Sequence, residues 1–168
     1  MREKQKYKTK AKPGKYLTFK LGDEHYGLDI HKVIEIIGMK DVTPVPKTPD
    51  FVKGVINLRG IIHPVIDLNK KFGRGMTEET DLTCIIVVTL EKDQKKEQMG
   101  IIVDQVSEVE DIEAENIEEP PGLGTNINTG FITGMAKIKD KVKMLLDLQE
   151  ILTTDEINMI SKVGNDKN

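Results

Sequence analysis

The side chains that could bind a metal ion or act as a nucleophile are few and scattered along the chain. The three histidines, His25, His31 and His63, lack the i, i+3 or i+4 pairing of a helical metal site, and Cys84 is the one cysteine. Zinc sites require clustered nitrogen and sulfur ligands, so we expect no metal site. Cys84 lies in the apolar run CIIVV, where its thiolate form is disfavoured, which argues against a nucleophilic role.

Covalent, phosphate-binding and acid–base chemistry have little support either. The chain has two serines, Ser107 and Ser161, and contains neither a G-x-S-x-G elbow nor a G-x-x-x-x-G-K-[ST] phosphate loop. GLGTNI (122–127) begins like a dinucleotide fingerprint but lacks its third glycine. No fixed spacing pairs the carboxylates for glycoside chemistry. We therefore expect no catalytic residue, no cofactor and no enzymatic activity, with a small-ligand-binding enzyme as the alternative.

A single arginine interrupts the most apolar part of the first half of the chain. Residues 51–70 read FVKGVINLRGIIHPVIDLNK, and Arg59 stands near the middle. A guanidinium offers planar donors to carboxylates and carbonyls. Arg59 is therefore either the solvated tip of a hairpin or a contact for another protein.

The composition predicts a soluble, cytoplasmic protein with an aliphatic core. The 168 residues fit one domain or two small ones, with 38% hydrophobic, 32% charged and only 4% aromatic residues and no Trp. A net charge of −3 does not favour nucleic acid as a partner. The single cysteine fits a reducing compartment. Because no apolar run approaches the roughly 20 residues of a membrane span, we expect membrane association only through a partner.

Two segments carry most of the charge asymmetry. Residues 1–15 hold seven basic groups and one acid, which is typical of a disordered, solubilising tail, with a weak membrane-surface or acidic-partner role as the alternative. Residues 107–119 hold seven acids and no base. This acidic run lacks the ligand spacing and central glycine of a calcium loop, so we expect solvated faces and a loop.

Short extended segments separated by turns dominate the chain. Strands are predicted at YLTFKL (16–21), YGLDI (26–30), LTCIIVVTL (82–90) and MGIIVDQVSEV (99–109), and HKVIEII fits a short helix or a strand. Hairpins are predicted for 51–69, with its turn at Arg59-Gly60, and for FITGMAKI with VKMLLDL. Three prolines make TPVPKTP (43–49) an extended connector, and Pro64 predicts an edge strand or a bulge.

Helix-capping signals mark the C-terminal part. Asp147 with Glu150 predicts a cap for LQEIL, and Thr153 with Glu156 has the spacing of a capping box.

An internal repeat organises these elements. Residues 26–36 align with 99–109, and residues 51–70 align without a gap with 131–150, at offsets of 73 and 80 residues. In the second alignment Gly54 matches Gly134 and Asp67 matches Asp147. Two β units of this size each have a marginal core, so we expect them to pack together. The expected divisions are a tail (1–15), two barrel halves (16–79 and 80–152) and a C-terminal helix and tail (153–168), forming one domain over about 15–160, with strand exchange between the halves left open.

The motifs in combination resemble one family. FKLGDEHYGLDIHKVIEI followed by TPVPKTPDFVKGVINLRGIIHPVIDL, together with GIIVDQVSEV and the second hairpin, is similar to the CheW family of bacterial chemotaxis coupling proteins. The resemblance runs from about Tyr16 to Met159. It implies a mainly β fold of two SH3-like five-stranded β-barrels packed together, with short helices that include one near the C-terminus.

The resemblance also implies a role as a non-catalytic adaptor. Members of this family join the cytoplasmic tips of chemoreceptors to the regulatory domain of the histidine kinase CheA, and a related two-component pathway is the alternative. The residues implied in receptor binding are Val33, Glu35 and Arg59, with Gly54, Val55 and Ile56 shaping the groove. A kinase contact maps loosely to the loop from Glu118 to Leu123.

Overall fold

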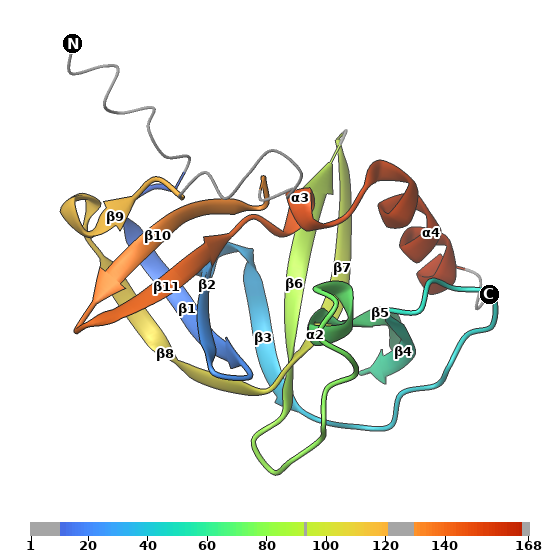
Figure 1. Cartoon of the computed structure of the whole chain (residues 1–168). Helices are drawn as coiled ribbons and strands as arrows, with labels where there is room; N and C mark the ends of the chain where they lie inside the picture. The colour runs from blue at the N-terminus through green and yellow to red at the C-terminus, as the bar shows by residue number, and fades with distance from the viewer. Residues whose placement is uncertain (1–10, 93, 121–129, 166–168) are drawn as a thin grey trace.

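The computed structural model describes residues 11–92, 94–120 and 130–165 (Figure 1). The strands are β1 (Gly14–Leu21), β2 (Glu24–Asp29), β3 (Val33–Gly38), β4 (Val52–Leu58), β5 (Ile61–Asp67), β6 (Cys84–Lys92), β7 (Lys95–Val103), β8 (Gln105–Ile112), β9 (Ile117–Glu118), β10 (Ile132–Ile138) and β11 (Lys141–Leu146). The helices are the 3₁₀ turns η1 (Ile30–Lys32) and η2 (Ala114–Asn116) and the α-helices α2 (Leu68–Lys71), α3 (Leu148–Ile151) and α4 (Thr154–Asn165). Within the described residues no helix is both long and apolar enough to span a bilayer.

The strands form two small sheets, which confirms the predicted mainly β fold with few short helices. One sheet has the order β8-β1-β2-β11-β10-β9, and the other has the order β3-β6-β7-β5-β4. We call them the six-stranded and five-stranded sheets. The sixth strand, β9, is only two residues long, so five longer strands make up each sheet.

Each sheet combines strands from both halves of the sequence (Figure 1). The strands β1 and β2 pair with β8 and β11, whereas β6 and β7 pair with β3 and β5. Neither sheet is therefore confined to residues 16–79 or to residues 80–152. The exchange includes two parallel pairings in which a glycine lies opposite a branched residue: Gly27 opposite Leu145, and Gly100 opposite Val65. A Cβ at Gly27 would lie 2.9 Å from Leu145 Cδ2, so the absence of a side chain permits the close approach.

The predicted single strand MGIIVDQVSEV is wrong, because a corner at Asp104 divides it between β7 and β8, which belong to different sheets. The Asp104 carboxylate accepts hydrogen bonds from the Gly22 amide (2.5 Å) and from Asn69 Nδ2 (3.3 Å). These partners lie far away in the sequence. The apolar pattern continues across the corner, so periodicity alone does not reveal it.

The internal repeat is visible in matching backbone contacts. The amide of Asp67 donates to the Phe51 carbonyl, and the amide of Asp147 donates to the Phe131 carbonyl, both at 2.8 Å. The register shifts between Val52 and Gly54 on β4 and between Ile132 and Gly134 on β10. The carboxylates of Asp67 and Asp147 then cap α2 and α3, so the predicted cap at Asp147 is confirmed.

The core consists of one large cluster between the sheets and a smaller cluster inside each curled sheet. The large cluster joins Phe19 and Leu28 of the six-stranded sheet to Ile66 and Ile101 of the five-stranded sheet, and all four are almost completely buried. Leu58 and Ile85 belong to the cluster within the five-stranded sheet. The two units thus share apolar surface, as their small size requires.

The predicted edge strand at Pro64 is wrong, because β5 lies between β4 and β7. The register of the hairpin shifts instead between Val52 and Gly54, opposite Ile66 and Val65. Pro64 pairs with Val55, whose backbone N–H and C=O both bond to Thr43 at 2.9 Å. The nitrogen of Pro64 therefore faces away from β4 and toward β7. Pairing of β5 with β7 begins one residue later, at Val65. The missing N–H thus costs no ladder hydrogen bond.

The predicted capping box is confirmed at α4. The Thr153 amide donates to the Glu156 carboxylate at 2.9 Å, and the Glu156 amide donates to Thr153 Oγ1 at 3.0 Å. Lys71 also binds Glu156 at 3.0 Å, which ties α4 to the end of β5 through α2. Figure 1 shows α4 beside β4 and β5.

Candidate protein-binding site

Arg59 lies at the tip of the β4–β5 hairpin. Leu58 pairs with Ile61, so Arg59 and Gly60 form a two-residue turn with φ angles of 52° and 89°. This left-handed turn matches the twist of the flanking strands, and glycine accepts it more readily than arginine does. The Gly60 amide donates to Asn57 Oδ1 at 2.8 Å. The turn therefore fixes the direction in which the arginine leaves the hairpin.

The Arg59 guanidinium forms an ion pair with Glu35 of β3. The Arg59 side chain is 71% exposed, and the Glu35 side chain is 27% exposed. A guanidinium has five N–H donors, so this pairing leaves donors directed to solvent. The strands β3 and β4 are the two edges of the five-stranded sheet, and the ion pair helps to hold these edges together.

Three exposed isoleucines lie close to Glu35 and Arg59 in the sequence. Ile34 and Ile36 flank Glu35 and are 44% and 45% exposed, and Ile61 follows the turn and is 60% exposed. At the repeat positions the second half has Ser107 in place of Ile34 and Lys141 in place of Ile61. At these two positions the exposed isoleucine is therefore particular to the five-stranded sheet, whereas Val109, at the repeat position of Ile36, is itself 50% exposed.

The other residues implied in receptor binding are buried or partly buried and contribute to the packing of the sheet. Val55 and Ile56 are 3% and 2% exposed, so they shape the sheet and offer little contact area. Gly54 has a φ of 148°, and a Cβ there would lie 2.1 Å from the Thr43 carbonyl oxygen. Val33 is partly buried and packs against the core between the sheets. The structure thus brings Arg59 and Glu35 together at the surface and places the apolar members beneath or beside them.

The residues implied in kinase binding lie elsewhere. Glu118 is on β9, at the edge of the six-stranded sheet, and pairs with Lys137 of β10 at 2.5 Å. Both side chains are more than half exposed. Leu123 lies outside the described residues.

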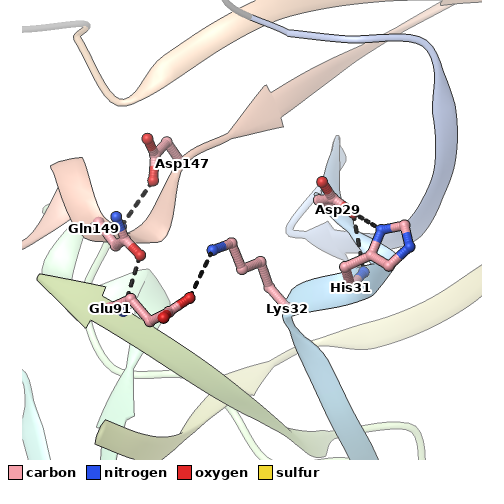
Figure 2. Close-up of polar contacts among 6 residues, drawn as sticks. All are labelled: Asp29, His31, Lys32, Glu91, Asp147 and Gln149. Atoms are coloured by element: carbon pink, nitrogen blue, oxygen red, sulfur yellow. Dashed lines mark hydrogen bonds and ion pairs between the residues drawn. The ribbon is translucent and has the colours of Figure 1, made fainter. Parts of the chain in front are cut away.

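A cleft between the two sheets has polar residues at and near its rim, and the contacts among the described ones are structural (Figure 2). Asp147 accepts from the Gln149 amide at 3.0 Å, and Gln149 Oε1 accepts from the Glu91 amide at 2.9 Å. Lys32 lies 3.9 Å from the Glu91 carboxylate. These contacts cap α3 and join it to β6, which gives them a structural explanation.

The carboxylate of Asp29 on the same rim caps η1 through His31 (Figure 2). Burial opposes ionisation of Asp29, but hydrogen bonds from His31 outweigh it and lower the pKa of the carboxyl. Among the described residues no group of three or more His, Cys, Asp or Glu side chains is placed to hold a metal ion.

The comparisons with known proteins agree with the motifs. A family model described as a CheW-like domain matches residues 15–156. The chain belongs to the CheW family. It is 38% identical over 149 residues to the chemotaxis protein CheW of Klebsiella aerogenes, covering 89% of this chain and 87% of that protein. It is 33% identical over 151 residues to CheW of Treponema pallidum, covering 88% and 86% of the two chains.

A solved CheW structure shares the fold. The crystal structure of the scaffolding protein TtCheW from Thermoanaerobacter tengcongensis matches with a TM-score of 0.73 and 41% sequence identity, over 87% of this chain and 92% of that chain. CheW-family proteins are non-catalytic scaffold proteins of chemotaxis. The prediction that the chain is not an enzyme therefore holds, and the small-ligand-binding alternative is set aside.

Sequence reasoning missed Ile34 and Ile36 as surface residues of this CheW-family fold. The segment VIEIIG has isoleucines at both odd and even positions, so its alternation does not distinguish a buried face from an exposed one. HKVIEII was predicted as a short helix or a strand, and the position of β3 at a sheet edge was the missing information. An edge strand with isoleucines on both faces would have pointed to an interaction surface.

Proposed function

We propose that this CheW-family chain is a cytoplasmic adaptor that couples the tips of chemoreceptors to the histidine kinase CheA. The observation that carries the proposal is the exposed Arg59–Glu35 pair, whose two residues have exposed isoleucines close by in the sequence. Exposed apolar side chains next to an arginine are typical of protein interfaces. The receptor tip is helical, and one face of a helix can cover such a surface.

The receptor-binding surface consists of Ile34, Glu35, Ile36, Arg59 and Ile61. The isoleucines bury apolar area against the receptor, while Arg59 donates to its carboxylates or carbonyls. Glu35 already holds the guanidinium, so little side-chain entropy remains to be lost on binding. Val33, Gly54, Val55 and Ile56 keep the strands in the shape that this contact needs.

The kinase-binding surface lies on the six-stranded sheet, and Glu118 on β9 belongs to it. Glu118 and Arg59 belong to different sheets, which allows a receptor and the CheA regulatory domain to bind at the same time.

Binding of the two partners to one molecule is the test. The purified chain is immobilised and exposed to a receptor-tip fragment and to the CheA regulatory domain, first separately and then together. We expect each to bind and the two together to form a ternary complex. Displacement of one fragment by the other, or failure of either to bind, would contradict the adaptor role.

A further inference from the structure

Asn57 contacts the turn that carries Arg59. Its Oδ1 accepts from the Gly60 amide at 2.8 Å. In a two-residue turn of this kind the hairpin's own hydrogen bonds connect Leu58 with Ile61, so the Gly60 amide has no strand partner. Asn57 supplies that partner and fastens the second residue of the turn to β4.

Lys40, which follows the opposite edge strand β3, also contacts Asn57. Its Nζ donates to the Asn57 carbonyl oxygen at 2.6 Å. That carbonyl points away from β5, as the Val55 carbonyl two residues earlier does, because Val55 bonds to Thr43 on that side. Lys40 lies five residues after Glu35 on the segment that continues β3. β3 and the residues that follow it therefore contact the hairpin at two points: Glu35 pairs with Arg59, and Lys40 donates to Asn57.

The repeat provides an internal comparison. In the second hairpin Lys137, Lys139 and Asp140 occupy the positions of Asn57, Arg59 and Gly60. Lys139 and Asp140 have φ angles of 49° and 68°, so the same left-handed turn forms without an asparagine. Lys137 pairs with Glu118 instead. Formation of the turn therefore does not require Asn57, and the added contacts occur in the half that carries Arg59.

We propose that Asn57 and Lys40 are positioning residues that hold Arg59 against Glu35 in the orientation in which it meets a carboxylate or carbonyl of its partner. This inference rests on the proposed receptor-binding function. Without the two contacts the turn still forms, but Arg59 leaves Glu35 more often. Binding then has to restore the orientation, which weakens affinity.

A partner-free measurement tests the positioning directly. Hydrogen exchange of the Gly60 amide is followed by NMR in the full chain and in Asn57→Ala, Asn57→Asp and the repeat-matched control Lys137→Ala. Loss of one hydrogen bond predicts exchange about tenfold faster in Asn57→Ala. Asn57→Asp keeps an acceptor and should retain the protection, and Lys137→Ala should match the unmodified chain. Unchanged exchange in Asn57→Ala would overturn the positioning role.

The second readout is affinity for the receptor-tip fragment. Asn57→Ala and Lys40→Met should each weaken binding by about fivefold to tenfold, whereas Lys137→Ala should leave it unchanged. Faster Gly60 exchange with unaltered affinity would overturn the inference, since the contacts would then be structural only. If the unmodified chain does not bind the fragment, the proposed function fails, while the exchange data still decide whether Asn57 fixes the turn.

Discussion

The ion pairs Lys143–Glu110 and Arg59–Glu35 differ in how deeply they are buried. Loss of one partner should therefore affect stability differently in the two cases. The Lys143–Glu110 pair joins β11 to β8, with side chains only 8% and 13% exposed. The Arg59–Glu35 pair joins the β4–β5 turn to β3 with the arginine 71% exposed. An exposed pair contributes about 0–1 kcal/mol, whereas removal of one partner from a buried pair leaves an uncompensated charge. Arg59 is therefore available for recognition, whereas loss of Lys143 alone would leave the Glu110 carboxylate buried without its partner.

Replacement of Lys143 should be strongly destabilising. Lys143→Met leaves the Glu110 carboxylate buried without its partner, and we expect the free energy of unfolding to fall by about 3–5 kcal/mol. Urea denaturation followed by circular dichroism measures the loss. The double variant Lys143→Met/Glu110→Leu removes both charges and should recover most of it. A single variant as stable as the original would show that the pair contributes nothing.

The stability of the chain should depend on pH through His63. The residue is 8% exposed, and burial lowers the pKa of its imidazole, with nearby Arg59 acting in the same direction and a hydrogen bond to the Gln98 backbone opposing them. The unfolded chain then binds a proton at a higher pH than the folded chain does. Stability should be full above the unfolded pKa of about 6.5 and should decrease as the pH falls toward the folded pKa.

Urea midpoints between pH 8 and pH 5.5 measure this dependence. His63→Gln removes one titrating group and should reduce the slope over that interval, while His25, whose pKa burial also lowers, retains the rest. A profile with the same slope in this variant would assign the pH dependence to other groups.

At the scale of elements, the hairpins and caps could be predicted because their signals are local. The turn at Arg59-Gly60, the cap at Asp147 and the Thr153–Glu156 capping box depend on neighbouring residues and appear as expected. The corner at Asp104 and the central position of β5 could not be predicted. They depend on hydrogen bonds and strand pairings between residues that are distant in the sequence.

The candidate site was predictable to a similar extent. Glu35 and Arg59 could be named from the family motifs, but their contact depends on how the two edges of the five-stranded sheet meet. The exposure of Ile34 and Ile36 depends on β3 being an edge strand, which the sequence pattern does not specify.

Gly54 gives a test of the close approach that shapes β4. A Cβ at this position would meet the Thr43 carbonyl carbon and oxygen at 2.7 and 2.1 Å, and the φ of 148° disfavours any side chain. Gly54→Ala should therefore lower the free energy of unfolding by about 1–3 kcal/mol. Gly38→Ala is the control, because no atom lies within 4 Å of a Cβ there. Equal urea midpoints for the two variants would contradict the close contact.

At the scale of the whole molecule, strand exchange makes the two sheets depend on each other. The β1–β2 hairpin completes a sheet whose other long strands come from after residue 104, and β6–β7 completes the sheet of β3, β4 and β5. The shared cluster between the sheets adds to this dependence. Two surfaces on such a frame keep a fixed separation, which suits a scaffold.

A fragment that ends at residue 79 should not fold alone. It contains β1 and β2 without β8 and β11, and β3 and β5 without β6 and β7. We expect a fragment of residues 11–79 to show no cooperative thermal transition by circular dichroism, whereas residues 11–165 should show one. A cooperative transition in the shorter fragment would contradict the dependence between the halves.

We propose that Arg59 on the five-stranded sheet contacts the receptor tip. The decisive measurement is binding of a receptor-tip fragment to Arg59→Glu, beside the repeat-matched control Lys139→Glu. Charge reversal should weaken binding at least about tenfold, or 1.4 kcal/mol, and by more than Arg59→Ala does. The control should bind normally. The free energy of unfolding of Arg59→Glu, measured by urea denaturation, should change by about 1 kcal/mol or less, and its binding to the CheA regulatory domain should persist. Undiminished receptor binding by a folded Arg59→Glu chain would contradict the claim.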